Sequence, residues 1–469
     1  MISLDAFNSI KAGAETNTRI FTPQKIVKEM IEALPPEVWN SKTTFLDPAV
    51  KSGVYLVEIF DKLMEVLADD ENFKDESVRR KHILENQLFG IAIDEFDNLV
   101  AQRNLYGFIG GDSNIRYIEK YMDLVKNKDS RFYVDAVKKE FGEMKKFGVI
   151  IGNPPYQEMD GGNAASAKPI YHCFVEKANN IGNVISMIVP SRWFAGGKGL
   201  DDFRKMMLAN RKITEIHDYQ DASKVFENVN VAGGVNYFII NKFYTGECKV
   251  YNHNDAVTNV MQRPLGINGI VIRDNVAFNI ARKIWDTKAS VELSQIVHSR
   301  NAFDIQSSNT GMIKQDEQYC IKCYGNDGIT YVTKDWFFDK EKLFDLYKVI
   351  VTRGIGGKGF VLTKNTEVLN PKEVCTETFI CIGGFKTRGE ADNLRSYLLC
   401  KFTRFLLLQA LTSIAISKDK FCLIPLQDFT NQSDIDWSQS IADIDKQLYK
   451  KYNLTDEEIA YIEATIKPM

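Results

Sequence analysis

The sequence predicts an α/β chain with an open, largely parallel sheet in residues 1–255 and a second, α+β domain in residues 256–469. Residues 148–152 form an apolar, β-branched run, which is typical of a strand buried on both faces of a parallel sheet. Residues 44–56 have the pattern of a strand, a tight loop and a helix, as in a βαβ unit. A length of 469 residues leaves room for two or three domains.

Composition narrows the class of protein. Hydrophobic residues make up 44% and charged residues 26% of the chain, which are ordinary globular values. The net charge of −3 indicates that any nucleic-acid surface is a local patch. We found no apolar run of about 18 residues and no apolar leader, so we expect a cytoplasmic protein without membrane contact.

The eight cysteines are scattered, which indicates reduced thiols rather than a disulfide framework. Cys320 and Cys323 have the spacing of metal ligands, but no second Cys or His pair lies nearby in the sequence to complete four ligands. We therefore expect ordinary strand cysteines and no bound metal.

The first helix is expected to begin at Thr22 and Pro23. Thr22 can cap the helix N-terminus, and Pro23 fits the first helical position. Apolar residues then recur at helical spacing, at Ile26, Val27, Met30, Ile31 and Leu34. A second strand is expected over residues 87–94, and a later hairpin over residues 224–229 and 233–240.

The run 148–152 ends abruptly in Asn153-Pro154-Pro155-Tyr156. The prolines cannot continue a hydrogen-bonded ladder, so they hold a rigid turn just beyond the strand, where open α/β sheets bind ligands. The Asn153 side-chain oxygen and the Pro154 carbonyl can both accept from an exocyclic amino group, and Tyr156 can stack on the ring that carries it. This pattern favours a pocket for an extruded base over a plain proline turn.

The string resembles the Asn-Pro-Pro-Tyr motif of S-adenosylmethionine-dependent amino-methyltransferases. That superfamily includes N6-adenine DNA methyltransferases, some RNA methyltransferases and protein-glutamine methyltransferases. The resemblance implies a Rossmann-like methyltransferase sheet, S-adenosyl-L-methionine as cofactor, and Asn153, Pro154, Pro155 and Tyr156 as the catalytic turn.

The same resemblance implies where the cofactor is held. A Thr-Pro pair such as Thr22-Pro23 lies beside the methionine part of the cofactor in this family. Residues 47–53 resemble the cofactor loop, with Asp47 near the ammonium and the following helix N-terminus near the carboxylate. The matching positions are Asp47, Pro48, Ala49, Ser52 and Gly53. The chain departs from the commonest form at Val50 and Lys51, where Cys-Gly is usual.

An acidic residue after the second strand usually accepts from the cofactor ribose in such enzymes. The commonest position corresponds to Ala92, which cannot do so, and Asp94 is the next candidate. The glycine-rich segment 157–167 has the composition of a lid over substrate or of a plain surface loop. Phe226 best matches the family's aromatic that closes the far side of the extruded base, although an apolar core position would also explain it.

The order of these motifs resembles the γ arrangement of restriction–modification adenine methyltransferases, in which a DNA target-recognition domain comes last. Residues 298–424 carry 18 basic and 14 acidic side chains, a net +4, whereas residues 425–469 carry a net −5. In the glycine-rich stretch 353–359, Arg353 and Lys358 are candidates for contacts to DNA phosphates, and a plain hairpin is the alternative. A capping box at Thr455 and Glu458 predicts a structural C-terminal helix.

We therefore expect a site-specific DNA adenine-N6 methyltransferase that acts on double-stranded DNA, with a separate restriction nuclease subunit as a candidate partner. Three other functions stay open. A nuclease core would need a Glu-x-Lys triplet on its own sheet, and the triplets at 143–145 and 247–249 lie within the methyltransferase part. A non-catalytic DNA-binding relative is suggested by Lys51 and Ala92. RNA or protein methylation would not require so long a C-terminal domain.

Overall fold

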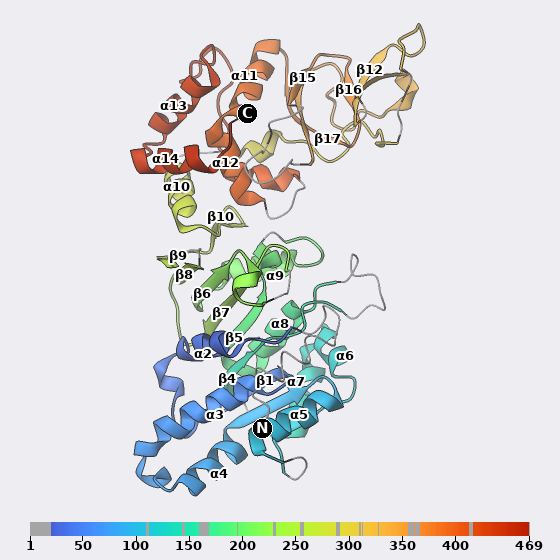
Figure 1. Cartoon of the computed structure of the whole chain (residues 1–469). Coiled ribbons are helices and arrows are strands. Elements are labelled where there is room, and N and C mark those ends of the chain that lie inside the picture. Colours follow the sequence, from blue (N-terminus) through green and yellow to red (C-terminus); the bar gives the residue numbers. More distant parts are fainter. Residues whose placement is uncertain are drawn as a thin grey trace. The chain divides into compact units, whose positions relative to one another are not determined.

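The chain divides into two compact units, Met1–Leu265 and Gly266–Met469. The computed structural model (Figure 1) describes residues 20–108, 112–142, 146–158, 168–194, 196–227, 231–253, 258–287, 291–308, 311, 313–326, 328–354, 362, 366–411 and 416–468. The division falls ten residues after the boundary predicted at 255. The reason is that strand β9 (Thr258–Arg263) pairs with β8 (Cys248–His253) at the edge of the first unit's sheet.

One sheet organises the first unit, with nine strands among the described residues in the order β3-β2-β1-β4-β5-β7-β6-β8-β9. Pairing is parallel from β3 to β5, antiparallel around β7, and parallel again between β6 and β8. The predicted α/β class is confirmed. The remaining strand bounds are β1 Phe45–Val50, β2 Leu88–Ala92, β3 Ile115–Tyr117, β4 Phe147–Gly152, β5 Gly182–Pro190, β6 Ile213–Tyr219 and β7 Val235–Asn241.

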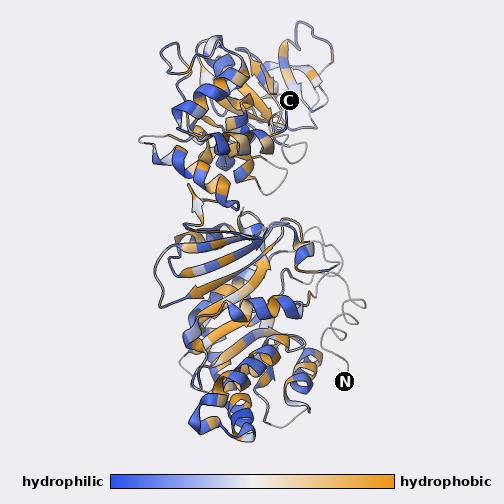
Figure 2. Cartoon of the chain, turned by 60° about the vertical axis from the view of Figure 1, so that its left-hand side comes forward, coloured by the Kyte–Doolittle hydropathy of each residue, from blue (hydrophilic) through white to orange (hydrophobic). Residues whose placement is uncertain are grey.

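Helices cover both faces of the parallel part of this sheet. Val149 and Ile151 of β4 share one apolar core with residues of α2 (Gln24–Glu32), α3 (Val54–Val66), α4 (Glu76–Asn86) and α5 (Glu95–Tyr106). Ile150 faces the other way, toward the end of α8 (Tyr171–Ile181), which packs with α6 (Tyr121–Lys126) and α7 (Ser130–Phe141). Figure 2 shows hydrophobic strands in the interior of this sheet, whereas strands toward one side of it are mixed or hydrophilic.

Two local predictions were wrong. Helix α2 begins at Gln24 with Pro23 at its N-cap, and no side chain caps it; the buried Thr22 hydroxyl accepts from Tyr55 and Asn153 instead. The late hairpin consists of β6 and β7 rather than residues 224–229 and 233–240. Residues 222–224 form a 3-10 turn between those strands, because Asp221 caps it through the Ser223 amide.

The second unit is α+β, with two three-stranded sheets and four helices after them among its described residues. One sheet has the order β13-β12-β16 and the other β15-β14-β17. Its bounds are β10 Gly266–Ile267, β11 Ile270–Val271, α10 Asn275–Asp286, β12 Ile321–Gly325, β13 Gly328–Val332, β14 Tyr347–Thr352, β15 Glu367–Leu369, β16 Val374–Cys375, β17 Phe379–Phe385, α11 Arg388–Leu399, α12 Lys401–Ala410, α13 Ile441–Lys451 and α14 Asp456–Thr465. The capping box predicted at Thr455 and Glu458 is confirmed.

The two cysteines with the spacing of metal ligands lie at strand β12. Cys323 is buried on β12 and Cys320 is exposed just before it. Within the described ranges, no group of three His, Cys, Asp or Glu side chains is arranged to hold a metal ion. A search of the same ranges found no helix with the length and apolar character needed to cross a bilayer.

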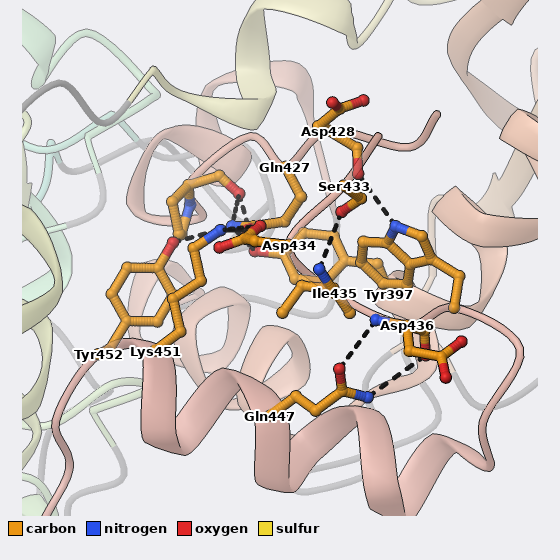
Figure 3. Close-up of polar contacts among 12 residues, drawn as sticks. Tyr397, Gln427, Asp428, Ser433, Asp434, Ile435, Asp436, Gln447, Lys451 and Tyr452 are labelled. Carbon is orange, nitrogen blue, oxygen red and sulfur yellow. Dashed lines mark hydrogen bonds and ion pairs between the residues drawn. The ribbon is translucent and has the colours of Figure 1, made fainter. Parts of the chain in front are cut away.

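A polar network fastens the segment 425–437 onto α11 and α13 (Figure 3). The buried Gln427 amide donates to the Tyr452 hydroxyl at 2.8 Å and to the Pro425 carbonyl at 3.3 Å. Its oxygen accepts from the Lys451 ammonium at 2.8 Å, and Lys451 also contacts Asp434. Buried amides are stabilising only when both ends are paired, as they are here.

We expect Gln427→Leu to lower the free energy of unfolding of the second unit by about 1–3 kcal/mol, because it removes the donor to the buried Tyr452 hydroxyl and one of the two partners of the Lys451 ammonium and of the Pro425 carbonyl. Urea unfolding of the full chain measures the change. The exposed Gln432→Leu is the matched control and is expected to change stability by less than about 0.5 kcal/mol. Equal stability of the two variants would contradict this role.

Candidate active site at the carboxyl ends of β1 and β4

The site forms where the strand order of the first unit changes direction. From β1 the chain proceeds to β2 on one side, and later reaches β4 on the other side. Open α/β sheets bind ligands in the crevice outside the carboxyl ends of such strands. Asn153 directly follows β4, Asp94 lies two residues after β2, and Asp47 is the third residue of β1. The fold brings Asp47 and Asn153, which are far apart in sequence, to one pocket.

The Asn153 side chain has a defined orientation. It is 4% exposed, and its Nδ2 donates to the Ile20 carbonyl and to the Thr22 hydroxyl, each at 3.1 Å. A carbonyl can only accept, so the amino end of the amide must face Ile20. Oδ1 consequently points elsewhere, is buried, and has no hydrogen-bond donor among the described residues. A buried acceptor without a donor is costly unless a ligand supplies one.

Tyr156 and Phe226 lie in contact beside this turn. Their ring centroids are 6.5 Å apart at an interplanar angle of 66°, an edge-to-face arrangement. Phe226 is only 2% exposed and belongs to the core. In this arrangement it packs against the Tyr156 ring and supports it. Burial raises the pKa of Tyr156 well above its ordinary value, which keeps the phenol neutral. A contact between Phe226 and a base stays a prediction.

Asp47, within β1, lies close to the end of β4. Asp47 is 3% exposed, and its Oδ1 accepts from the Ala49 amide at 3.0 Å. Burial raises the pKa of Asp47 to about 7, against smaller opposing effects of that amide and of the Lys51 charge. A side chain on Gly152 would place its Cβ 2.7 Å from Asp47 Oδ1, so it would displace the Asp47 carboxylate.

A glycine also begins the helix that follows. Gly53 has φ +81° at the N-cap of α3, a left-handed conformation that side chains rarely adopt. A Cβ there would lie 3.3 Å from Ala101 of α5. Ser52 is buried, and its hydroxyl has no hydrogen-bond partner among the described residues. Thus this loop presents an unpaired polar atom next to the N-terminus of α3, whose first amides have no acceptor within the helix.

The segment before α2 forms the opposite wall. The Thr22 hydroxyl accepts from Tyr55 at 3.0 Å as well as from Asn153. Together these elements line a small pocket of about 20 Å³ that opens to solvent. Its lining residues are Ile20, Phe21, Thr22, Asp47, Ala49, Lys51, Ser52, Gly53, Val54, Tyr55 and Asn153.

Three of the predicted cofactor residues take other positions around this pocket. Pro23 is the N-cap of α2, and the Pro48 carbonyl accepts from the buried Tyr121 hydroxyl at 2.9 Å. Asp94 begins α5 directly after β2, where its carboxylate accepts from the Asp97 amide at 2.7 Å. Asp94 therefore lies at the same end of the strands as Asn153, although one of its oxygens caps α5.

The proposed phosphate contacts belong to the second unit. Arg353 follows β14, where its amide donates to the Thr378 carbonyl at 3.1 Å and its carbonyl accepts from Ile416 at 2.7 Å. The pKa of the Glu377 carboxyl is held below its ordinary value mainly by the hydrogen bond from Arg300 and, more weakly, by the charge of Arg353. Lys358 and most of the segment 157–167 lie outside the described residues.

Sequence reasoning missed the residues that support Asn153. The Ile20 carbonyl is a backbone group, and Tyr55 has the pattern of an ordinary core position of α3. Tyr121, which holds the Pro48 carbonyl, lies in a segment without recognisable motif. Among the supporting residues, only Lys51 could be noticed in the sequence, because the resembled motif usually has glycine at this position.

Comparison with known proteins finds methylases that are similar to the first unit. Residues 86–226 match the family model described as Eco57I restriction-modification methylase. An uncharacterised adenine-specific methylase of Mycoplasma pneumoniae is 29% identical over 293 residues, 49% of this chain and 69% of that protein. The tRNA (guanine(6)-N2)-methyltransferase of Methanocaldococcus jannaschii is 28% identical over 149 residues, 30% of this chain and 38% of that protein.

The fold extends this similarity to most of the chain. A nuclease-deletion mutant of the Type ISP restriction-modification enzyme LlaGI, in complex with a DNA substrate mimic, superposes with a TM-score of 0.52 at 11% identity. The match covers 86% of this chain but only 46% of that one, so the chain spans less than half of the length of the LlaGI structure. At this identity the likeness establishes the fold alone.

We expect Gly53→Ala to lower the melting temperature more than Gly107→Ala does. Both glycines have positive φ, +81° and +83°, but only a Cβ at Gly53 meets a neighbour. The control thus isolates the backbone cost, about 1 kcal/mol. Differential scanning calorimetry of the two variants measures the difference, and equal shifts would show that the Ala101 contact at the pocket is not tight.

Proposed function

We propose that this chain is a site-specific DNA adenine-N6 methyltransferase that uses S-adenosyl-L-methionine, acting as the modification component of a restriction–modification or related defence system. The observation that carries the proposal is the Asn153 amide, whose Oδ1 is buried, oriented and without a donor beside a rigid Pro-Pro turn. The similarity to restriction-modification and adenine-specific methylases supports the same chemistry.

The pocket residues fit the proposed cofactor. Asp47 would hold its ammonium, and the amides at the start of α3 with the free Ser52 hydroxyl would hold its carboxylate. Asp94, at the end of β2, would accept from the ribose. When bound, the cofactor would supply an electrophilic methyl group whose leaving group is a neutral thioether, and the methylated amino nitrogen would release one proton to water.

The residues of the turn would act on the acceptor. Asn153 Oδ1 and the Pro154 carbonyl would accept both N–H bonds of an adenine amino group, which directs its lone pair away from the ring toward the methyl carbon. Tyr156, supported by Phe226, would stack on the extruded base. Such catalysis depends mostly on positioning and requires no metal and no covalent intermediate on the chain.

Duplex DNA is the proposed substrate, with the second unit supplying target recognition. Arg353 and Lys358 remain the proposed phosphate contacts, although the nearby Glu377 carboxylate competes for Arg353. A separate restriction nuclease subunit is the proposed protein partner. The relative that methylates tRNA keeps RNA as the alternative acceptor, and the experiment below separates the two.

We expect the purified protein with S-adenosyl-L-methionine to generate N6-methyladenine in unmethylated plasmid DNA, measured by nucleoside mass spectrometry. Asn153→Ala removes the acceptor and the anchor to Ile20, so methylation is expected to fall at least about 100-fold. Tyr156→Phe is the matched control. It retains the stacking ring and loses only a hydroxyl without a partner among the described residues, so it is expected to keep activity within about threefold.

Two results would overturn the assignment. Near-normal DNA methylation by Asn153→Ala would remove this amide from the chemistry. Methylated guanine or adenine in a tRNA pool, together with unmodified plasmid DNA, would assign the enzyme to RNA. Sequencing the methylated plasmid then gives the recognition site.

The affinity for S-adenosyl-L-methionine is expected to depend on pH through Asp47. Its pKa of about 7 lies above the ordinary 3.8, so the carboxylate is largely protonated at pH 6 and largely ionised at pH 8. Only the ionised form can pair with an ammonium, so we expect the Kd to be about tenfold higher at pH 6 than at pH 8. Isothermal titration calorimetry measures this, and Asp47→Asn should bind weakly with no such dependence. A flat profile in the wild type would exclude Asp47 as the cation partner.

A further inference from the structure

Lys51 makes contacts that its position in the sequence does not explain. It follows β1 in the loop before α3, where the resembled motif usually has glycine. Its Nζ donates to the Ile20 carbonyl at 2.8 Å and to the Asn153 backbone carbonyl at 3.2 Å. These carbonyls are 31 residues before and 102 residues after Lys51, so one ammonium joins three separate segments of the chain.

The contacts close a ring around the catalytic turn. The Ile20 carbonyl accepts from Lys51 Nζ and also from Asn153 Nδ2. Asn153 is therefore held at two points: its backbone through Lys51, and its side chain through Ile20 and Thr22. A carbonyl has two lone pairs, so both donors can be served at once. Movement of any one segment would break bonds to the other two.

Charge and packing around Lys51 suit a fixed ammonium. Asp47 lies in the same pocket, and the Lys51 charge acts on its carboxyl. The Phe21 ring centroid is 6.0 Å from Nζ, within the range of a cation–π contact. Hydrogen bonds from a charged donor to carbonyls are stronger than neutral ones, so they hold geometry well. Glycine at this position could make none of these contacts.

We propose that Lys51 is a positioning residue: it ties the segment before α2 to the turn after β4, and thereby aims Asn153 Oδ1 at the substrate. This inference rests on the proposed function for the identity of the reaction, but the tie itself is a property of the chain alone. The position of the pocket wall at Ile20–Thr22 and the orientation of the Asn153 amide are thus coupled.

The test compares Lys51→Met with the wild type, using Lys81→Met as control because Lys81 is 73% exposed and remote in sequence from the site. Methionine retains the length and apolar stem of lysine but cannot donate. At pH 9, where the Asp47 carboxylate is ionised in both proteins, we expect kcat for DNA methylation to fall about 10–100-fold, while the KM for S-adenosyl-L-methionine changes less than about threefold. Lys51→Arg, which can still donate, is expected to recover part of the lost kcat.

A readout without turnover accompanies the kinetics. Hydrogen–deuterium exchange of the peptide covering residues 20–30 is expected to quicken at least about tenfold in Lys51→Met and to stay unchanged in Lys81→Met. Circular dichroism confirms the fold of each variant. This measurement reports the tie even in the absence of DNA and cofactor.

The outcomes separate the two claims. Wild-type protein that methylates DNA, with Lys51→Met equal to it in kcat and exchange, would overturn the role of Lys51 and leave the proposed function intact. A changed KM for S-adenosyl-L-methionine with unchanged kcat and exchange would also overturn it, because Lys51 would then act on cofactor charge. Faster exchange in Lys51→Met, with no methylation by the wild type on any acceptor, would retain the tie and overturn the proposed function.

Discussion

The parallel pairing of β1 with β4 is the constraint on which the candidate site depends. Phe45 pairs with Val149 and Leu46 with Ile150, so the two strands end side by side although about a hundred residues separate them. The absence of a side chain at Gly152 lets the Asp47 carboxylate approach the end of β4. Without this register, the loop after β1 and the turn after β4 could not line one pocket.

Burial gives this pocket its chemistry. Polar groups removed from water must find partners, and most of those near β1 and β4 find them within the chain. Thr22, Tyr55, Ile20 and Asn153 Nδ2 satisfy one another, whereas Asn153 Oδ1, Ser52 Oγ and the Tyr156 hydroxyl have no partner among the described residues. The same desolvation raises the pKa of Asp47 to about 7. The unpaired atoms are thus defined by the way in which their neighbours are paired.

Polar contacts have different roles in the two units. In the second unit, Gln427 is paired at both its oxygen and its nitrogen, and the network around it fastens the segment 425–437 onto helices α11 and α13. Nothing in that network is left for a ligand, so its role is structural. In the first unit, one end of the Asn153 amide is fastened and the other is not. Gln87 and Asn236 also have a paired amide nitrogen and an unpaired oxygen. The position of Asn153 beyond the carboxyl end of β4 is therefore what marks it as a candidate site.

Local sequence determined several helices, strands and turns of this protein, and the residue types that its candidate site contains. The apolar run 148–152 and the two prolines after it specify a buried strand and a rigid turn through side-chain burial and backbone geometry alone. The capping box at Thr455 and Glu458 likewise acts within a few residues. Tertiary structure alone decided which way the Asn153 amide faces and that Thr22 is a hydrogen-bond acceptor rather than a helix cap. It also decided that Phe226 packs against Tyr156. It also gave Lys51 its partners. Each of these depends on contacts between segments remote in sequence, and neither spacing nor composition encodes such contacts.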